Sequence, residues 1–231
     1  MRLSTATVTG AAVAAAWSLP SIASHVPSVA NLLDIPLRID ATQAVAITFD
    51  DGPHPEGTPA VLAALADAGA VATFFVVGEQ VRRYPSLVAE AAAAGHQIEL
   101  HGDTHRAHVR LSPRAVSEDL RRGHAAIAEV TGREPQVHRP PYGIYSAASL
   151  GITRRANYRL LLWSRWGHDW SNRQTPQTIC SEVTEQLACG DVLLLHDADH
   201  YSNKDSWKAT AAALPAVLAR IEALGLKTVG V

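Results

Sequence analysis

The feature that most constrains the fold is an alternation that begins near residue 44. Short apolar runs are separated by longer stretches rich in alanine and leucine at helical spacing, which is typical of repeated βα units around a parallel sheet. Seven apolar runs have the length of strands, at 44–49, 72–77, 97–100, 136–138, 158–163, 192–195 and 227–231. Helices are expected between them, at 58–68, 79–94, 113–131, 146–156, 176–188 and 207–224.

Several predicted helices carry start and stop signals. Ser112 before Pro113 has the form of an N-cap followed by a first-turn proline, and Gly132 stands where the same helix should end. The pattern fits either a single βα barrel or an open doubly wound sheet. In both folds the chemistry lies at the carboxyl ends of the strands.

The first 40 residues do not share this alternation, so we divide the chain into an N-terminal segment, 1–40, and one folded domain, 41–231. A cation at Arg2, an apolar run at 11–19 and a small-residue triplet ending at Ala23 resemble a weak signal peptide cleaved after Ala23. An alanine-rich helix is the alternative. Because a transmembrane helix needs about 20 apolar residues, we expect no stable membrane span. We expect a secreted or cell-envelope protein, with a cytoplasmic location as the alternative.

Composition excludes two classes of function. The chain has 20 Lys+Arg against 22 Asp+Glu and no run of cations, which argues against a nucleic-acid partner. Its two cysteines are too few for a disulfide scaffold or a thiolate-rich zinc module. Cys180 and Cys189 flank a predicted helix end, and we expect both to be buried free thiols. Eleven histidines are the unusual component.

Two adjacent carboxylates, Asp50 and Asp51, follow the first predicted strand. Neighbouring residues of an extended chain point to opposite sides, so one carboxylate can bind a metal while the other handles a proton. The same Asp-Gly-Pro sequence is also ordinary turn chemistry.

Two histidines, His101 and His105, follow the third predicted strand in a His-x-x-x-His arrangement. This spacing suits zinc when a third ligand comes from elsewhere. His96 and His108 flank the pair, and we take them as peripheral.

Three further strand ends carry polar residues. They are the turn from His138 to Gly143, the stretch from Trp163 to Trp170, and His196 at the tip of an apolar run. Each motif is weak alone, but together they place acids, histidines and an arginine on one face. If they were instead turn and capping groups of an unrelated βα protein, five motifs would have to coincide.

In this order, TFDDGP, HGDTH, RPPYG, HDW and LLLH resemble the polysaccharide deacetylase family of metal-dependent carbohydrate esterases, which includes chitin-oligosaccharide and peptidoglycan deacetylases. The resemblance covers residues 44–231. It implies an α/β fold, a distorted and incomplete βα barrel with about seven parallel strands.

The resemblance also implies a metal site and a base. Asp51, His101 and His105 would bind the metal, most often zinc, with cobalt or another divalent ion as the alternative. Asp50 would be the general base, held ionised and oriented by Arg139.

The same resemblance implies an acid and an acetyl pocket. His196 would be the general acid, held by Asp169, and the backbone N–H of Tyr142 would help to stabilise the oxyanion. Trp170 and Leu194 would line the pocket for the acetyl methyl group.

Two positions depart from the family pattern. Gly102 replaces the usual Ser or Thr after the first metal histidine, so we expect a hydrogen bond that braces this loop to be missing. Trp166 replaces the first Asp of a D-x-x-D-W motif, so we expect a change in the shape of the substrate groove.

We therefore expect a hydrolase that uses a metal-activated water to remove acetyl groups from N-acetylated sugars, with an acetylated carbohydrate as its partner. An O-acetyl xylan esterase or an amidase on a small non-sugar amide is the alternative within hydrolases. A non-catalytic carbohydrate-binding protein is the alternative outside them. The polar segment 197–207 is expected to be a rim loop.

Overall fold

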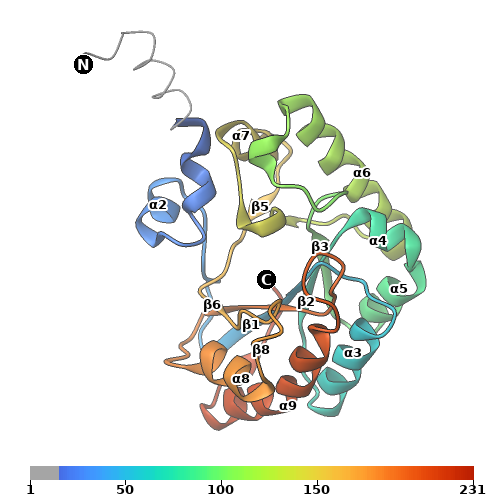
Figure 1. The fold of residues 1–231 in the computed structure, drawn as a ribbon, viewed down its shortest axis with the longest axis vertical. Coiled ribbons are helices and arrows are strands. Elements are labelled where there is room, and N and C mark those ends of the chain that lie inside the picture. Colours follow the sequence, from blue (N-terminus) through green and yellow to red (C-terminus); the bar gives the residue numbers. More distant parts are fainter. Residues whose placement is uncertain (1–15) are drawn as a thin grey trace.

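The computed structural model describes residues 16–231 as one sheet surrounded by helices (Figure 1). Every strand pair in the sheet is parallel, and the order is β5-β4-β3-β2-β1-β7-β6, with β8 paired to the start of β1. The strands are β1 Ala44–Asp50, β2 Thr73–Val76, β3 Gln97–Leu100, β4 Val137–His138, β5 Arg159–Leu160, β6 Arg165–Trp166, β7 Val192–His196 and β8 Lys227–Thr228. The sheet curls but does not close between β5 and β6, which confirms the predicted incomplete barrel.

The helices lie around the outside of the curled sheet, except for α2, which lies on its open side (Figure 1). The α-helices are α2 Pro27–Leu32, α3 Gly57–Asp67, α4 Gly78–Arg83, α5 Pro85–Ala93, α6 Pro113–Thr131, α7 Ala147–Arg155, α8 Pro176–Thr184 and α9 Trp207–Ala223. Three short 3-10 turns are η1 Leu19–Ile22, η2 His108–Arg110 and η3 Pro141–Gly143.

Two differences from the sequence-based expectation have a clear physical cause. The helix expected at 79–94 is two helices, α4 and α5, because Pro85 disfavours helical geometry at Tyr84, whose φ and ψ are −133° and 56°. The strand β6 was not predicted, because its two residues have no periodicity of their own and are extended by pairing with Leu193 and Leu194.

The core has two parts, one on each face of the sheet. All seven residues of β1 are buried, as expected for a parallel strand that is covered on both faces. One apolar cluster lies between the sheet and the outer helices, and the other fills the inside of the barrel around Phe75, Tyr145 and Leu162.

Residues 19–39 pack across the open side of the barrel. Ala23, Ala30 and Ile35 are buried in the inner cluster. The backbone of this segment bonds to both sides of the opening: Leu162 N donates to Pro36 O at 2.9 Å, and Ile39 N donates to Gly190 O at 2.9 Å. The segment therefore completes the barrel that the sheet leaves unfinished.

The predicted cleavage after Ala23 falls in a buried part of this segment, whereas the start of the predicted leader, residues 1–15, lies outside the described residues. In residues 16–231 no helix combines the length and the apolar character that a membrane crossing requires.

The cysteine prediction is half right. Cys180 and Cys189 are both free, as predicted. Cys180 is half-buried and Cys189 is exposed, so the prediction that both are buried is wrong. The reason is that α8 ends at Thr184, five residues earlier than Cys189, which lies instead in the turn before β7.

Candidate active site

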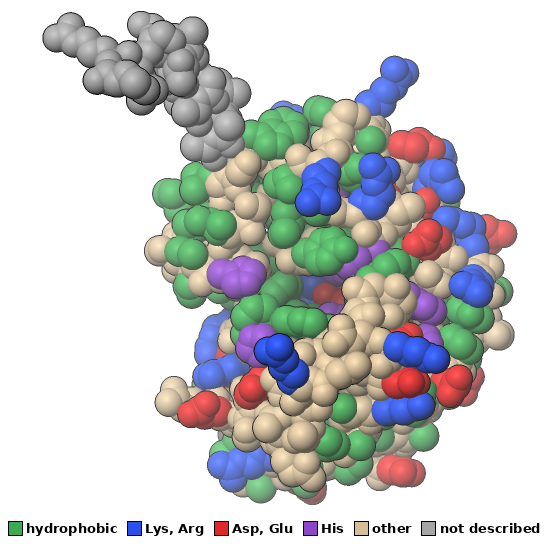
Figure 2. Space-filling model, viewed as in Figure 1, with side chains coloured by type: hydrophobic (Ala, Val, Ile, Leu, Met, Phe, Trp, Pro, Cys, Tyr) green, Lys and Arg blue, Asp and Glu red, His purple; other side chains and the backbone are tan. Residues whose placement is uncertain are grey.

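The predicted site residues meet in one pocket of about 350 Å³ at the carboxyl ends of the strands. Figure 2 shows a hollow near the middle of the visible face, with histidine and apolar side chains around it. Eight of the predicted residues line the pocket: Asp50, Asp51, His101, His105, Tyr142, Trp170, Leu194 and His196. Arg139 and Asp169 lie behind them, each bonded to a residue of the pocket.

Asp50 and Asp51 do not point to opposite sides, which corrects the sequence-based expectation. Asp50 is the last residue of β1, and Asp51 turns into the left-handed region with φ 78°. This conformation is uncommon for a residue with a Cβ, and residues held in it cluster at active sites. The turn brings both carboxylates to the same pocket, where each has different partners.

Asp51, His101 and His105 offer ligand atoms that all lie within 4.8 Å of one another. Oδ1 of Asp51 is 3.4 Å from Nε2 of His101 and 3.1 Å from Nε2 of His105. Tetrahedral ligands at zinc bond lengths lie roughly 3.3 Å apart. The donor set and its spacing therefore fit a divalent cation of the zinc type.

The partner of His101 supports this fit. Nδ1 of His101 lies 2.9 Å from the carbonyl oxygen of Arg139 and donates to it, so in the neutral ring Nε2 carries the lone pair and faces Asp51. A carboxylate and an imidazole lone pair repel each other unless a proton or a metal cation lies between them. A backbone acceptor behind a histidine is the usual way to orient a metal ligand.

Burial opposes ionisation of Asp51. When no metal is bound, protons on the facing nitrogens of His101 and His105 outweigh burial and hold the pKa of this carboxyl well below its usual range. Asp51 is therefore charged, as a metal ligand must be.

The guanidinium of Arg139 fixes Asp50. It is fully buried, and its Nη1 donates to Oδ1 of Asp50 at 2.7 Å and to Oγ1 of Thr48 at 2.8 Å. Its Nε and Nη2 donate to the carbonyls of Leu161 and Leu162 at 3.2 and 2.8 Å. Because these bonds fix the plane of the guanidinium, Asp50 has one oxygen held and the other free.

The carboxylate of Asp169 fixes His196. Its Oδ1 accepts from Nδ1 of His196 at 2.8 Å, and its Oδ2 accepts from the backbone N of His196 and from Oγ1 of Thr210, both at 2.7 Å. Burial lowers the pKa of His196, but the charge of Asp169, with smaller effects of Asp51 and Asp50, raises it to about 10. A cation at Asp51 would offset part of this rise.

Aromatic rings lie on two sides of His105. The ring of Tyr142 meets His105 edge-on at 4.4 Å, and the ring of Tyr201 stacks on it at 4.2 Å. Tyr201 belongs to the predicted rim loop, which does reach the pocket through Tyr201 and Ser202. Tyr142 itself is left-handed, with φ 61°, in the turn formed by the two prolines before it.

Asp119 is a site residue that the sequence did not reveal. From α6 its carboxylate accepts from the backbone N of Asp103 at 2.8 Å, and from N and Oγ1 of Thr104 at 3.1 and 2.7 Å. A Cβ at Gly102, where φ is 99°, would approach Asp119 to 2.8 Å. The hydrogen bond expected to be missing at Gly102 is thus replaced by the bonds of Asp119 from α6. The absence of a Cβ at Gly102 leaves room for that carboxylate.

Asp119 was missed because it stands inside an amphipathic helix pattern, where an acid is normally a solvent-exposed residue. The sequence did carry one signal for a buried acid: Asp119 lies on the same helix face as Val116, Leu120 and Gly123.

A second histidine cluster, formed by His54, Asp199 and His200, does not have the chemistry of a metal site. Nδ1 of His54 accepts from the backbone N atoms of Glu56 and Gly57, so its proton is on Nε2, which donates to Asp199 at 3.2 Å. This cluster fastens the rim loop to the turn after β1.

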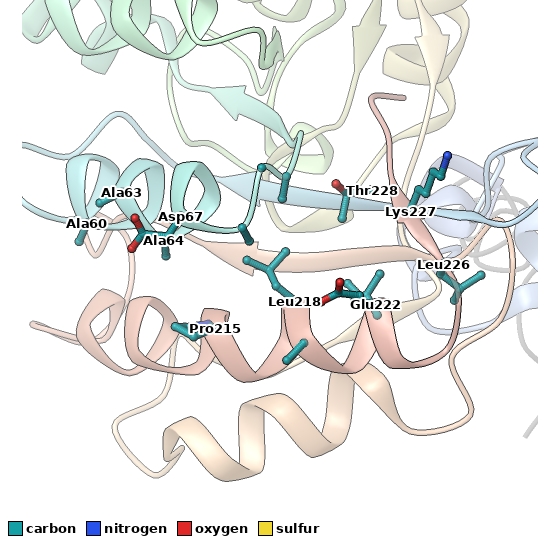
Figure 3. Close-up of a pocket in the computed structure, with 15 residues that line it drawn as sticks. Ala60, Ala63, Ala64, Asp67, Pro215, Leu218, Glu222, Leu226, Lys227 and Thr228 are labelled. Atoms are coloured by element: carbon teal, nitrogen blue, oxygen red, sulfur yellow. The ribbon is translucent and has the colours of Figure 1, made fainter.

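A larger pocket of about 750 Å³ lies between α3, α9 and β8 (Figure 3). It is lined mainly by small apolar side chains and is located near the start of β1, at the opposite end of the strands from Asp50. The chemistry is therefore assigned to the smaller pocket. His96 and His108 line neither of these pockets, in agreement with their peripheral assignment.

We predict that Asp119→Ala weakens zinc binding about 10- to 100-fold, because outer groups that orient a ligand loop contribute affinity of this size. The affinity is measured by competition with a chromogenic chelator. Glu118→Ala, which removes an exposed carboxylate from the same helix, is the control and should bind as the parent does. An Asp119→Ala protein that binds zinc as tightly as the parent would contradict the bracing role.

Comparisons with known proteins agree with this geometry. The family model described as polysaccharide deacetylase matches residues 39–161. A peptidoglycan-N-acetylglucosamine deacetylase of Bacillus cereus is 35% identical over 190 residues, which cover 81% of this chain and 85% of the relative. A chitooligosaccharide deacetylase of a Bradyrhizobium species is 34% identical over 160 residues, covering 69% and 73%.

A solved structure shares the fold and part of the sequence. The family 4 carbohydrate esterase from Streptomyces lividans, in complex with acetate, superimposes with a TM-score of 0.73 at 30% identity, covering 81% of this chain and 92% of the esterase. The matched range, 39–161, contains Asp50, Asp51, His101, His105 and Arg139. The chain belongs to the polysaccharide deacetylase family.

Proposed function

We propose that this protein is a metal-dependent hydrolase that removes acetyl groups from N-acetylated sugars of a polysaccharide or oligosaccharide. The observation that carries the proposal is the joint presence, in one pocket, of a carboxylate fixed by Arg139, an imidazole fixed by Asp169 and three side chains spaced to hold a metal ion. The names of the relatives, which act on peptidoglycan and on chitooligosaccharides, support the N-acetylated sugar class.

We propose zinc as the metal, with cobalt or another divalent ion as the alternative, held by Asp51, His101 and His105. When bound, such an ion polarises the amide carbonyl and lowers the pKa of water toward neutrality.

The first proton transfer belongs to Asp50. Arg139 occupies its Oδ1, so Oδ2 is the oxygen that takes the proton from the attacking water. The carbonyl oxygen becomes negative as the new C–O bond forms, and we assign the backbone N–H of Tyr142 as a donor to it.

The second proton transfer belongs to His196. The amine can leave only when it is protonated, because an amide anion is a very poor leaving group. Asp169 holds Nδ1 of the imidazolium, which leaves the Nε2 proton for the nitrogen of the departing amine. The C–N bond breaks and the products are acetate and a free amino sugar. Trp170 and Leu194, beside His196, suit the acetyl methyl group.

We also retain export to the cell envelope or medium as a prediction, since polymers of this class lie outside the cell membrane. Mass spectrometry of the mature N-terminus in a native host tests it, and a protein found with residues 1–23 inside the cell would contradict it.

The function is tested by acetate release from chitin oligomers, peptidoglycan, acetylated xylan and an aryl acetate. The protein is first stripped with a chelator and then assayed with and without zinc or cobalt. We expect metal-dependent release from an N-acetylated sugar. Release from xylan alone would favour the esterase alternative, and release from none of the substrates would contradict the proposal.

We predict that Asp50→Asn lowers kcat by about 10²- to 10⁴-fold, the usual contribution of a general base, while zinc content stays that of the parent. Metal analysis after dialysis accompanies the assay. Loss of the metal together with activity would show that Asp50 is a ligand rather than the base.

We predict that Asp169→Asn moves the alkaline limb of the pH profile of kcat/KM to lower pH by about one unit or more. Burial lowers the pKa of His196 and Asp169 raises it, so removing the carboxylate charge leaves the lowering effect and the acid loses its proton sooner as pH rises. Thr210→Val, which removes a hydrogen bond to Asp169 but no charge, should shift the limb less. A limb that stays in place in Asp169→Asn would identify another group as the acid.

A further inference from the structure

The two histidines of the proposed metal site are oriented in different ways. Nδ1 of His101 donates to the carbonyl oxygen of Arg139, whereas Nδ1 of His105 is buried and has no hydrogen-bond partner in residues 16–231. A histidine that binds a metal through one nitrogen almost always donates its other N–H to an acceptor, which fixes the plane of the ring. The plane of His105 therefore depends on contacts other than a hydrogen bond.

The ring of Tyr201 supplies such a contact. It lies nearly parallel to the imidazole of His105, with the planes at 10° and the centroids 4.2 Å apart, while Tyr142 meets the same imidazole edge-on. A ring stacked this closely opposes rotation of the imidazole, because tilting would bring atoms of the two rings into overlap. An imidazole bound to a divalent cation also becomes electron-poor, and the face of a phenol ring attracts positive charge. The stack therefore favours both the orientation of His105 and the presence of the cation.

Tyr201 is itself held at its hydroxyl group. The hydroxyl donates to Oε1 of Glu79 and accepts from Nε2 of Gln80 at 3.0 Å. Gln80 is buried, and a hydrogen bond to the ionised carboxylate of Glu79 is stronger than one between neutral groups. The position of the phenol ring is thus fixed by two side chains of α4.

The same helix holds the loop that carries His105. The backbone N of Gly78 donates to the carbonyl of Gly102, and the backbone N of Glu79 donates to the carbonyl of Asp103, both at 2.9 Å. Both carbonyls lie between the two histidines of the proposed metal site. Helix α4 therefore fixes the ligand loop through its backbone and the stacked ring through its side chains.

We propose that Tyr201 is a positioning residue for the metal site: its ring sets the plane of His105, and its hydroxyl ties that ring to α4. The inference rests on the proposed function and adds a group that determines the metal affinity of the same site. Tyr201 belongs to the rim loop, outside the residues 39–161 that the family model matches. Metal binding in this chain therefore depends on a loop beyond that range.

The test uses the full chain, stripped of metal with a chelator, and the variants Tyr201→Leu, Tyr201→Met and Tyr201→Phe. Zinc affinity is measured by competition with a chromogenic chelator, and the visible absorption of the cobalt-loaded protein reports the arrangement of the ligands. We expect the leucine and methionine variants, which lack a ring, to bind zinc about 10- to 100-fold more weakly and to show an altered cobalt spectrum. Tyr201→Phe, which keeps the ring, should recover most of the affinity.

Tyr84→Leu is the matched control. The ring of Tyr84 also packs on the rim loop, parallel to His200 with the centroids 6.4 Å apart, but it does not line the active-site pocket. This variant should bind zinc as the parent does. Melting temperatures of the metal-free proteins show which variants are folded. The flexible side chain of methionine fills the space of the ring, so Tyr201→Met provides the ring-free protein if Tyr201→Leu does not fold.

Zinc binding separates this inference from the proposed function, because it needs neither substrate nor turnover. The positioning role is overturned if the folded ring-free variants bind zinc as tightly as the parent with the same cobalt spectrum, or if Tyr84→Leu loses as much affinity as they do. A parent that binds zinc but releases no acetate contradicts the proposed function alone, and the affinities of the variants still decide the role of Tyr201. A parent that binds neither zinc nor cobalt overturns both.

Discussion

The buried guanidinium of Arg139 connects most of the parts that form the site. It bonds Asp50 and Thr48 of β1 and the carbonyl of Leu162 after β5, while the ring of Phe75 from β2 lies 4.0 Å from its Cζ. Its own carbonyl accepts from Nδ1 of His101, in the loop after β3. A charge with no exposed surface is costly to desolvate, and breaking such a pair leaves an uncompensated buried charge that costs about 3–5 kcal/mol. Asp50, His101 and the strands β1 and β3 are therefore positioned together by one side chain and its backbone.

Near Arg139, two residues have strained backbone conformations that the surrounding contacts hold in place. Asp51 and Tyr142 both have positive φ, each at a turn that follows a strand of the site. Such conformations cost of order 1–3 kcal/mol each and persist when surrounding contacts over-determine them. Here Asp51 lies between two histidines, and Tyr142 follows two prolines and contacts His105. The positive φ of Asp51 brings the two neighbouring carboxylates, Asp50 and Asp51, into one pocket.

The incomplete barrel gives the N-terminal segment a second role. A sheet that ends at β5 and β6 leaves its inner apolar cluster open on one side, and burial of Ala23, Ala30 and Ile35 covers it. The same packing brings residue 25 to the rim of the active site. Closure of the core and the shape of the substrate groove are therefore consequences of one packing arrangement, and a change in this segment is expected to affect both.

The sequence by itself determined the βα alternation, the ends of long periodic elements such as α6, and which polar side chains meet in one pocket. These follow from local patterns, since each functional residue lies just after an apolar strand and the carboxyl ends of parallel strands meet at one edge. Only the tertiary structure decided the pairing of β6, the brace from Asp119 and the place of the N-terminal segment. Each of these depends on contacts between residues far apart in the chain, which no local periodicity records.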